Sequence, residues 1–123
     1  MGDAGIERAI SSASIAGAAV IAAHPYGAES ADPHPRLTKR WACDEAFREL
    51  AHRFELFNRT QLYGWVAEAG LPSVASGDFH RPEHLAGWKT LLPTHGEEAA
   101  VVDYLRSRRP VYLARFEAAA GLA

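Results

Sequence analysis

Three side chains combine the residue types and positions that a metal centre requires. His24 comes directly after a short apolar run, and Asp78 and His80 follow another such run. Residues two apart in an extended segment project to the same side, so the Asp78 carboxylate and the His80 imidazole can converge on one ion. Zinc, manganese and iron all accept nitrogen and oxygen donors. His24, Asp78 and His80 are therefore the predicted metal ligands.

Each of these residues also has a purely structural interpretation. A histidine beside Pro25 can be a hydrogen-bonded loop residue, which is an alternative role for His24. Gly77-Asp78 is a common turn dipeptide, in which the carboxylate only caps local amides. The alternation of an extended segment places Phe79 on the opposite side from its two neighbours, in the wall of the site. The combination of the three polar residues favours the metal site over either alternative alone.

Helices and strands that could position these residues alternate along the chain. Apolar residues recur at helical spacing in four segments, 3–17, 41–51, 62–69 and 97–109. Short apolar runs typical of strands occupy 18–23, 54–57, 73–76, 88–92 and 111–116. The first predicted strand leads into a proline-containing loop over 24–36, which is long for a simple connection.

This alternation predicts an α/β fold with a mostly parallel sheet and crossover helices. Parallel neighbours need a long return connection, and a helix supplies it. Ligands of such sheets collect beyond the carboxyl ends of the strands, where the three predicted ligands lie. Residues 1–116 are expected to form one domain, and residues 117–123 a frayed tail.

Composition excludes several functional classes. The 123 residues include 13 basic and 15 acidic side chains, and their signs are interspersed, so a nucleic-acid-binding or polybasic membrane-binding surface is not expected. The longest apolar run, 15–23, is far shorter than the ~20 residues that span a bilayer. The single Cys43 cannot form an internal disulfide, and the first residues lack a signal-peptide pattern. We expect a cytoplasmic protein.

Several segments together resemble a known family of enzymes. The segments AHPY (23–26), ELFN (55–58) and SGDFH (76–80) occur in an order and spacing similar to the C-terminal part of the PHP family. This is the polymerase and histidinol phosphatase family of metal-dependent phosphoesterases. The segments GWKT (87–90) and RPVY (109–112) resemble the region that follows the barrel in such proteins.

The resemblance implies the C-terminal half of a distorted, seven-stranded β/α barrel. In this family the strand ends hold up to three divalent metal ions, commonly zinc, manganese or iron, and His24, Asp78 and His80 match the late ligands. The implied activity is hydrolysis of a small phosphomonoester or a nucleotide-like phosphodiester. Clustered cations neutralise the phosphate and activate water, so no catalytic residue beyond the metal ligands is expected.

Further residues are weaker candidates for the same site. Arg36 and Arg81 can hold phosphate oxygens through their guanidinium groups, although solvated surface arginines are an equal alternative. Asn58 and His84 can support the ligands through hydrogen bonds, with a capping role or plain exposure as the alternatives. Glu55 is given no catalytic role.

The sequence departs from the family pattern in one important respect. The early ligands of PHP proteins lie in a His-x-His motif, and no two histidines here are two residues apart. A complete β/α barrel needs ~200 residues or more, so we expect half a barrel that associates with another copy or with a complementary N-terminal half. Two alternatives remain open: a non-catalytic scaffold or regulatory module derived from this family, and an amidohydrolase-like metal enzyme.

Overall fold

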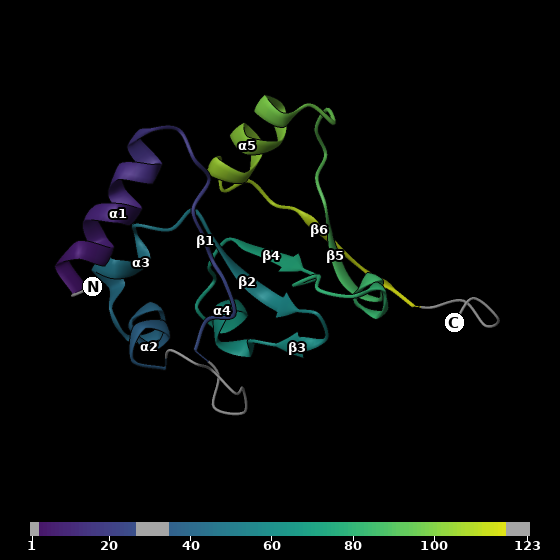
Figure 1. Cartoon of the computed structure of the whole chain (residues 1–123), viewed down its shortest axis with the longest axis horizontal. Coiled ribbons are helices and arrows are strands. Elements are labelled where there is room, and N and C mark those ends of the chain that lie inside the picture. Colours follow the sequence, from purple (N-terminus) through teal and green to yellow (C-terminus); the bar gives the residue numbers. More distant parts are fainter. Residues whose placement is uncertain (1–2, 27–34, 118–123) are drawn as a thin grey trace.

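The structure is a computed structural model that describes residues 3–26 and 35–117 (Figure 1). Residues 27–34 of the expected loop, and 118–123 of the expected tail, lie outside the described residues. The elements in chain order are α1 (Asp3–Ile15), β1 (Ile21–Ala22), α2 (Pro35–Cys43), α3 (Glu45–Arg48), β2 (Arg53–Asn58), β3 (Gln61–Leu62), α4 (Gly64–Glu68), β4 (Ser73–Ser76), the 3-10 helix η1 (Pro82–Leu85), β5 (Gly87–Leu91), α5 (Glu98–Arg106) and β6 (Tyr112–Phe116).

A small sheet with β2 in its centre organises the fold. Phe54 of β2 is in register with Ala22 of β1 on one edge and with Ser73 of β4 on the other, and both pairings are parallel. The strand β3 returns antiparallel to the end of β2 as a hairpin. The three parallel strands therefore end at one edge of the sheet, as the helix–strand alternation predicted. The α/β class is confirmed, and the described strands close no barrel.

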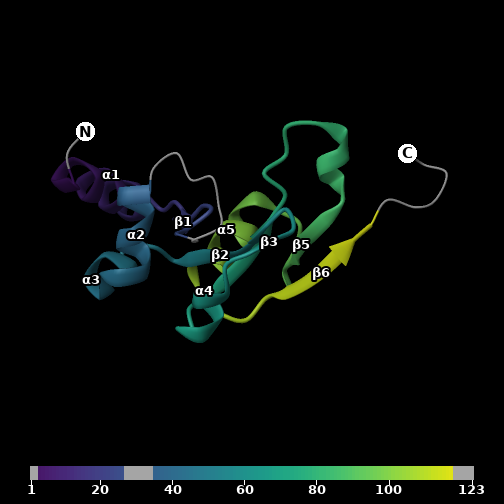
Figure 2. The same cartoon turned by 90° about the horizontal axis from the view of Figure 1, so that it is seen from below.

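The expectation of a mostly parallel sheet is wrong for the last two strands. β5 and β6 form a separate antiparallel ribbon, with Leu91 in register with Tyr112. The chain leaves β5 at Leu91, forms α5, and comes back to the same end of the ribbon, so β6 must run in the opposite direction. Figure 2 shows this ribbon at one end of the molecule and α1, α2 and α3 at the other.

All four expected helices have different limits in the structure. The helices expected over 3–17 and 97–109 are the shorter α1 and α5, and α2 begins at Pro35, within the expected loop. The helix expected over 41–51 is interrupted at Asp44, whose carboxylate accepts a hydrogen bond from the Phe47 amide (3.1 Å) and caps α3. That hydrogen bond, with the one from Arg40, lowers the pKa of Asp44. The helix expected over 62–69 begins at Gly64, because the residues before it form β3. No helix within 3–26 and 35–117 has both the length and the hydropathy needed to cross a membrane.

The core lies between β2 and the short helices α2, α3 and α4. Aromatic rings dominate it: Trp41 packs on Phe47 with 4.2 Å between ring centroids, and meets Phe54 edge-on at 5.7 Å. The buried members of this cluster are Ala22, Trp41, Phe47, Ala51, Phe54, Tyr63 and Val66. Because these rings come from α2, α3 and β2, their packing holds the two helices against the sheet.

Arg53, next to Phe54, anchors the C-terminal end of α5 to the sheet. The side chain is 1% exposed, and burial lowers the pKa of its guanidinium group. All of its hydrogen bonds go to backbone carbonyls: those of Leu105 (2.8 Å), Ser73 (3.3 Å), Tyr104 (3.2 Å) and Arg109 (2.6 Å). This one side chain thereby donates to carbonyls at and just after the end of α5, where intrahelical donors run out. The Tyr104 carbonyl also accepts the amide and hydroxyl of Ser107.

His52 makes the stability of the fold depend on pH. Its Nδ1 accepts a hydrogen bond from the Val20 amide (2.9 Å), and burial, with the charges of Arg106 and Arg108, lowers the pKa of the imidazole. The folded state thus favours the neutral ring. Above the unfolded pKa of about 6.5, the contribution of His52 to the free energy of unfolding should not change with pH. Below that value the contribution should fall as the pH drops towards the folded pKa.

The variant His52→Asn isolates this effect. Its Oδ1 replaces Nδ1 as the acceptor but does not titrate, so urea unfolding between pH 7 and pH 5 should show a shallower loss of stability than in the wild type. Equal pH dependence in the two proteins would contradict the assignment.

Candidate functional site at the carboxyl edge of the parallel strands

Each of the three parallel strands is followed by a non-glycine residue in the left-handed region. These residues are His24 (φ 27°) after β1, Arg59 (φ 56°) after β2 and Asp78 (φ 43°) after β4. Such conformations are uncommon outside glycine and cost of order 1–3 kcal/mol each, and they cluster at functional sites. Their gathering at one sheet edge marks that edge as the candidate site.

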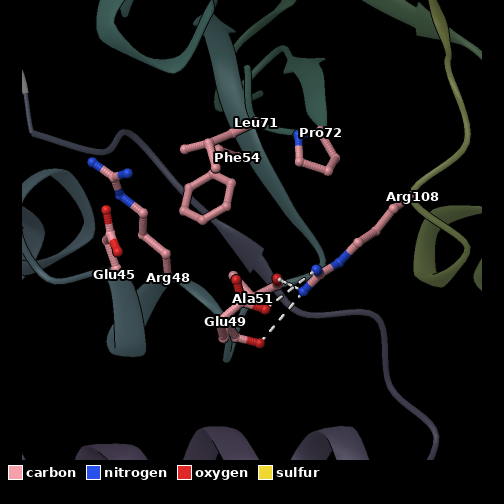
Figure 3. Close-up of a pocket in the computed structure, with 8 residues that line it drawn as sticks. All are labelled: Glu45, Arg48, Glu49, Ala51, Phe54, Leu71, Pro72 and Arg108. Carbon is pink, nitrogen blue, oxygen red and sulfur yellow. Dashed lines mark hydrogen bonds and ion pairs between the residues drawn. The ribbon is translucent and has the colours of Figure 1, made fainter. Parts of the chain in front are cut away.

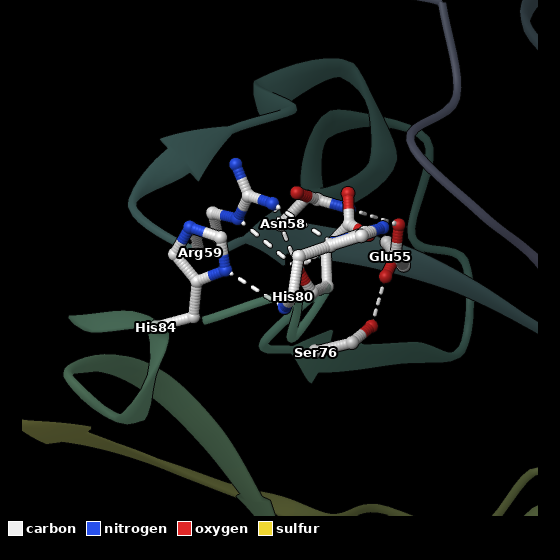
Figure 4. A network of polar contacts seen from close by, with 7 residues as sticks. Glu55, Asn58, Arg59, Ser76, His80 and His84 are labelled. Carbon is white, nitrogen blue, oxygen red and sulfur yellow. Dashed lines mark hydrogen bonds and ion pairs between the residues drawn. The ribbon is translucent and has the colours of Figure 1, made fainter. Parts of the chain in front are cut away.

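The carboxylate of Glu55 joins the ends of all three strands (Figure 4). Glu55 is 3% exposed. Its Oε1 accepts hydrogen bonds from the His24 backbone amide and from Asn58 Nδ2 (3.1 Å), and its Oε2 accepts one from the Ser76 hydroxyl. The expected supporting role of Asn58 therefore has a defined geometry, which is the orientation of a buried carboxylate.

A β-bulge places Glu55 and Asn58 on the same side of β2. Residues three apart in a regular strand point to opposite faces. Here Glu55 is in register with Val74, and the next paired residue, Phe57, is in register with Ala75, so Leu56 has no partner in β4. The extra residue shifts the alternation by one position and turns the Asn58 amide towards Glu55.

Asp78 and His80 lie together, and Arg59 fixes the turn that carries them. Arg59 donates to the backbone carbonyl of Asp78 through Nε (3.2 Å) and Nη2 (2.8 Å). His80 Nδ1 lies 2.7 Å from the same carbonyl oxygen and 3.3 Å from Asp78 Oδ1. Arg59 Nη2, which can only donate, lies 3.2 Å from the same nitrogen. Coordination of a cation through Nε2 requires the tautomer that carries its proton on Nδ1. The side chain of His80 is 67% exposed, which makes Nε2 accessible.

His84, in η1, supports the backbone of His80. Its Nδ1 accepts the His80 amide (2.9 Å), and Lys89 Nζ in turn donates to the His84 carbonyl (3.2 Å). Loss of hydration, together with the positive charges of Arg59 and Arg81, lowers the pKa of His84. A neutral ring is the form that this hydrogen bond requires. His84 therefore contacts the backbone of His80, and its support of a metal ligand stays a prediction.

Of the two arginines predicted to hold phosphate, Arg81 makes no side-chain hydrogen bond or ion pair with this network among the described residues. Arg36 lies within α2, and the position of its side chain is outside the described part of the protein. Arg81 is exposed, and its side chain has no hydrogen bond or ion pair with any residue in 3–26 or 35–117. Arg59 makes the contacts instead. It was missed because no motif singled it out, although it directly follows a strand, as His24 does.

The alternation predicted Phe79 in the wall of the site, and this prediction is wrong. Its side chain is 59% exposed, and its ring meets the His84 ring edge-on with 6.3 Å between centroids. The left-handed turn at Asp78 explains this difference, because it ends the extended conformation on which the alternation depends.

The ribbon β5–β6 contacts the site through Arg59. The Arg59 carbonyl accepts the Trp88 amide (3.2 Å), and the Trp88 ring stacks on Phe57 with 4.5 Å between centroids. Gly87 has a φ of 110°, and a Cβ at this position would lie 3.1 Å from the Arg59 carbonyl oxygen. The start of β5 must therefore be glycine for the chain to approach Arg59 so closely.

The donor set of the site fits a divalent cation in part. Asp78 supplies a carboxylate and His80 an available imidazole nitrogen, while the backbone of His24 is tied to the same network through Glu55. Within the described ranges, no group of three or more His, Cys, Asp or Glu side chains is arranged to hold a metal ion. The chain thus brings two of its three predicted ligands into contact after β4 and places the third after β1, on the other side of the central strand β2.

A cavity of about 170 Å³ lies at the opposite edge of the sheet (Figure 3). Phe54, Leu71 and Pro72 in its lining come from the beginning of β2 and from the segment before β4. Its arginines are engaged with backbone: Arg108 donates to the Ala51 carbonyl (2.8 Å), and Arg48 to the carbonyls at the end of α2. These contacts connect elements of the fold and show no ligand chemistry.

Comparison with known proteins adds no identification. No protein-family model matches the chain, and no curated protein matches it significantly.

Proposed function

We propose that this chain forms part of a metal-dependent phosphoesterase site of the PHP type, with the fold of the C-terminal half of the barrel. The observation that supports it best is the shared edge of β1, β2 and β4, which carries His24, Asp78 and the exposed side chain of His80. A carboxylate oxygen and a neutral imidazole nitrogen are donors that zinc, manganese and iron all accept.

The residues of this edge have distinct tasks in the proposed reaction. A bound divalent cation supplies positive charge for the phosphate oxygens and activates water. Asp78 and His80 bind it from one turn, and Arg59 holds that turn through the Asp78 carbonyl. The guanidinium of Arg59 also places a permanent positive charge beside His80, which favours an anionic substrate over a neutral amide. We therefore propose small phosphomonoesters and nucleotide-like phosphodiesters as the substrates.

We propose that the remaining ligands come from another chain or segment. The resemblance associates the late ligands found here with an early His-x-His motif that this sequence lacks. A second copy or a complementary N-terminal half would supply further metal ligands and phosphate contacts, and β1 presents an edge on which its strands could pair.

The test measures metal uptake and hydrolysis separately. Protein stripped with a chelator is titrated with Mn²⁺ or Zn²⁺ and assayed with p-nitrophenyl phosphate, its bis-ester and a p-nitroanilide. We expect saturable metal binding by this chain. Once a second copy or the complementary half completes the site, we expect phosphoester hydrolysis that needs the metal and leaves the anilide intact. A protein that binds neither metal contradicts the proposal, and cleavage of the anilide alone would favour the amidohydrolase alternative.

A further inference from the structure

We propose that Glu55 is a positioning residue for the metal ligands, because its carboxylate sets the spacing between the strand ends that carry His24 and Asp78. This inference rests on the proposed function. It concerns a residue for which the sequence pattern indicated no catalytic role.

The environment of the Glu55 carboxylate supports this role. Glu55 is almost completely buried, and its three hydrogen-bond donors are a backbone amide, a side-chain amide and a hydroxyl, all neutral. None of the ion pairs among the described residues includes Glu55. Burying a carboxylate without a cationic partner is costly. A cation at the adjacent strand ends would compensate that charge.

The two oxygens of the Glu55 carboxylate contact different strands. Glu55 lies on the central strand β2, and β1 and β4 flank that strand. One oxygen binds the amide of His24, a predicted ligand, and the other binds Ser76, two residues before the ligand Asp78. Each contact therefore lies at or next to a ligand-bearing turn. The bulge at Leu56 adds Asn58 as a third donor, which fixes the rotation of the carboxylate.

The test compares Glu55→Gln with a control variant that loses side-chain hydrogen bonds to the same strand, β4, from the other side. The glutamine keeps one acceptor oxygen and nearly the same shape, but it removes the charge and presents an NH₂ group to Ser76. In the control, Thr90→Val removes the two hydrogen bonds that the Thr90 hydroxyl makes with the Ala75 backbone in β4 (2.8 and 2.6 Å). Both variants lose buried polar contacts to β4, but only the first alters the proposed positioning contact.

We expect the Kd for Mn²⁺ to rise by about 10–100-fold in Glu55→Gln, the range typical of residues that orient metal ligands, and to stay at the wild-type value in Thr90→Val. Thermal unfolding without metal should not be lowered by Glu55→Gln, because the variant removes an uncompensated buried charge. The His24 amide provides a second readout: its NMR resonance should lie downfield and exchange slowly in the wild type, and lose both properties in Glu55→Ala.

The outcomes separate this role from the proposed function. Wild-type protein that binds no Mn²⁺ defeats both. Wild-type binding that is equally tight in Glu55→Gln defeats only the role of Glu55. An equal loss of affinity in Thr90→Val would also defeat it, because the effect would then be a general response to weakening β4.

Discussion

Replacing Arg53 with leucine is expected to lower the free energy of unfolding by about 3–5 kcal/mol. The leucine would remove this donor from the carbonyls of Leu105, Arg109 and Ser73, while the Tyr104 carbonyl keeps the amide and hydroxyl of Ser107. A buried acceptor left unsatisfied costs about 1–3 kcal/mol, and water entering the space recovers part of the sum. Domains of this size are stable by about 5–15 kcal/mol. The loss therefore represents a large fraction of the total, and urea denaturation measures it directly.

Arg115→Leu is the matched control for Arg53→Leu. Arg115 lies exposed on β6 and makes one 3.6 Å contact with the exposed Glu117. An exposed pair of this kind contributes little, so its replacement should change stability by no more than about 0.5 kcal/mol. If the two variants unfold at the same urea concentration, the guanidinium of Arg53 does not anchor α5 as described.

The double variant Asp78→Asn, His80→Gln is expected to bind divalent metal more than about 100-fold more weakly than the wild type. This loss exceeds the loss expected when a residue that only orients a ligand is replaced. Asparagine accepts the left-handed backbone that Asp78 adopts, so the turn held by Arg59 should persist. The change then removes the donors and leaves the fold. Calorimetric titration with Mn²⁺ and Zn²⁺ measures the Kd, and circular dichroism checks the fold.

His95→Gln is the control for the double variant. His95 is exposed in the segment between β5 and α5, outside the network at the strand ends. It should bind metal as the wild type does. Unchanged affinity in the Asp78 and His80 variant would remove both residues from the ligand set and the main support of the proposed phosphoesterase.

The class of the fold and the strand ends could be predicted because they depend on local patterns. An apolar run followed by a polar residue locates both His24 and Asp78, and both lie at the same edge of the parallel strands. The direction of β6 could not be predicted, because it depends on where α5 ends, and that end is held by Arg53, 52 residues away from Leu105. Pairing partners of this kind leave no periodic signal in the sequence.

The positions of the candidate ligands at the strand ends were predictable, but the contacts that surround them were not. Arg81 was chosen because it adjoins His80, yet Arg59 makes the contacts, because three-dimensional proximity comes from β2 and β4 lying side by side. The pairing of Glu55 with Asn58 was equally hidden. In a regular strand these two side chains would point to opposite faces, and only the bulge brings them together. Bulges depend on the neighbouring strand as much as on their own residues.

The unpaired position at Leu56 makes the length of β2 more important than the chemistry of that residue. Exchange of Leu56 for another apolar side chain preserves the count of residues between Glu55 and Asn58. Loss of the position would restore regular alternation and carry Asn58 to the other face of the sheet. Natural variation in this segment should therefore consist of exchanges, and single-residue deletions should be absent from functional descendants.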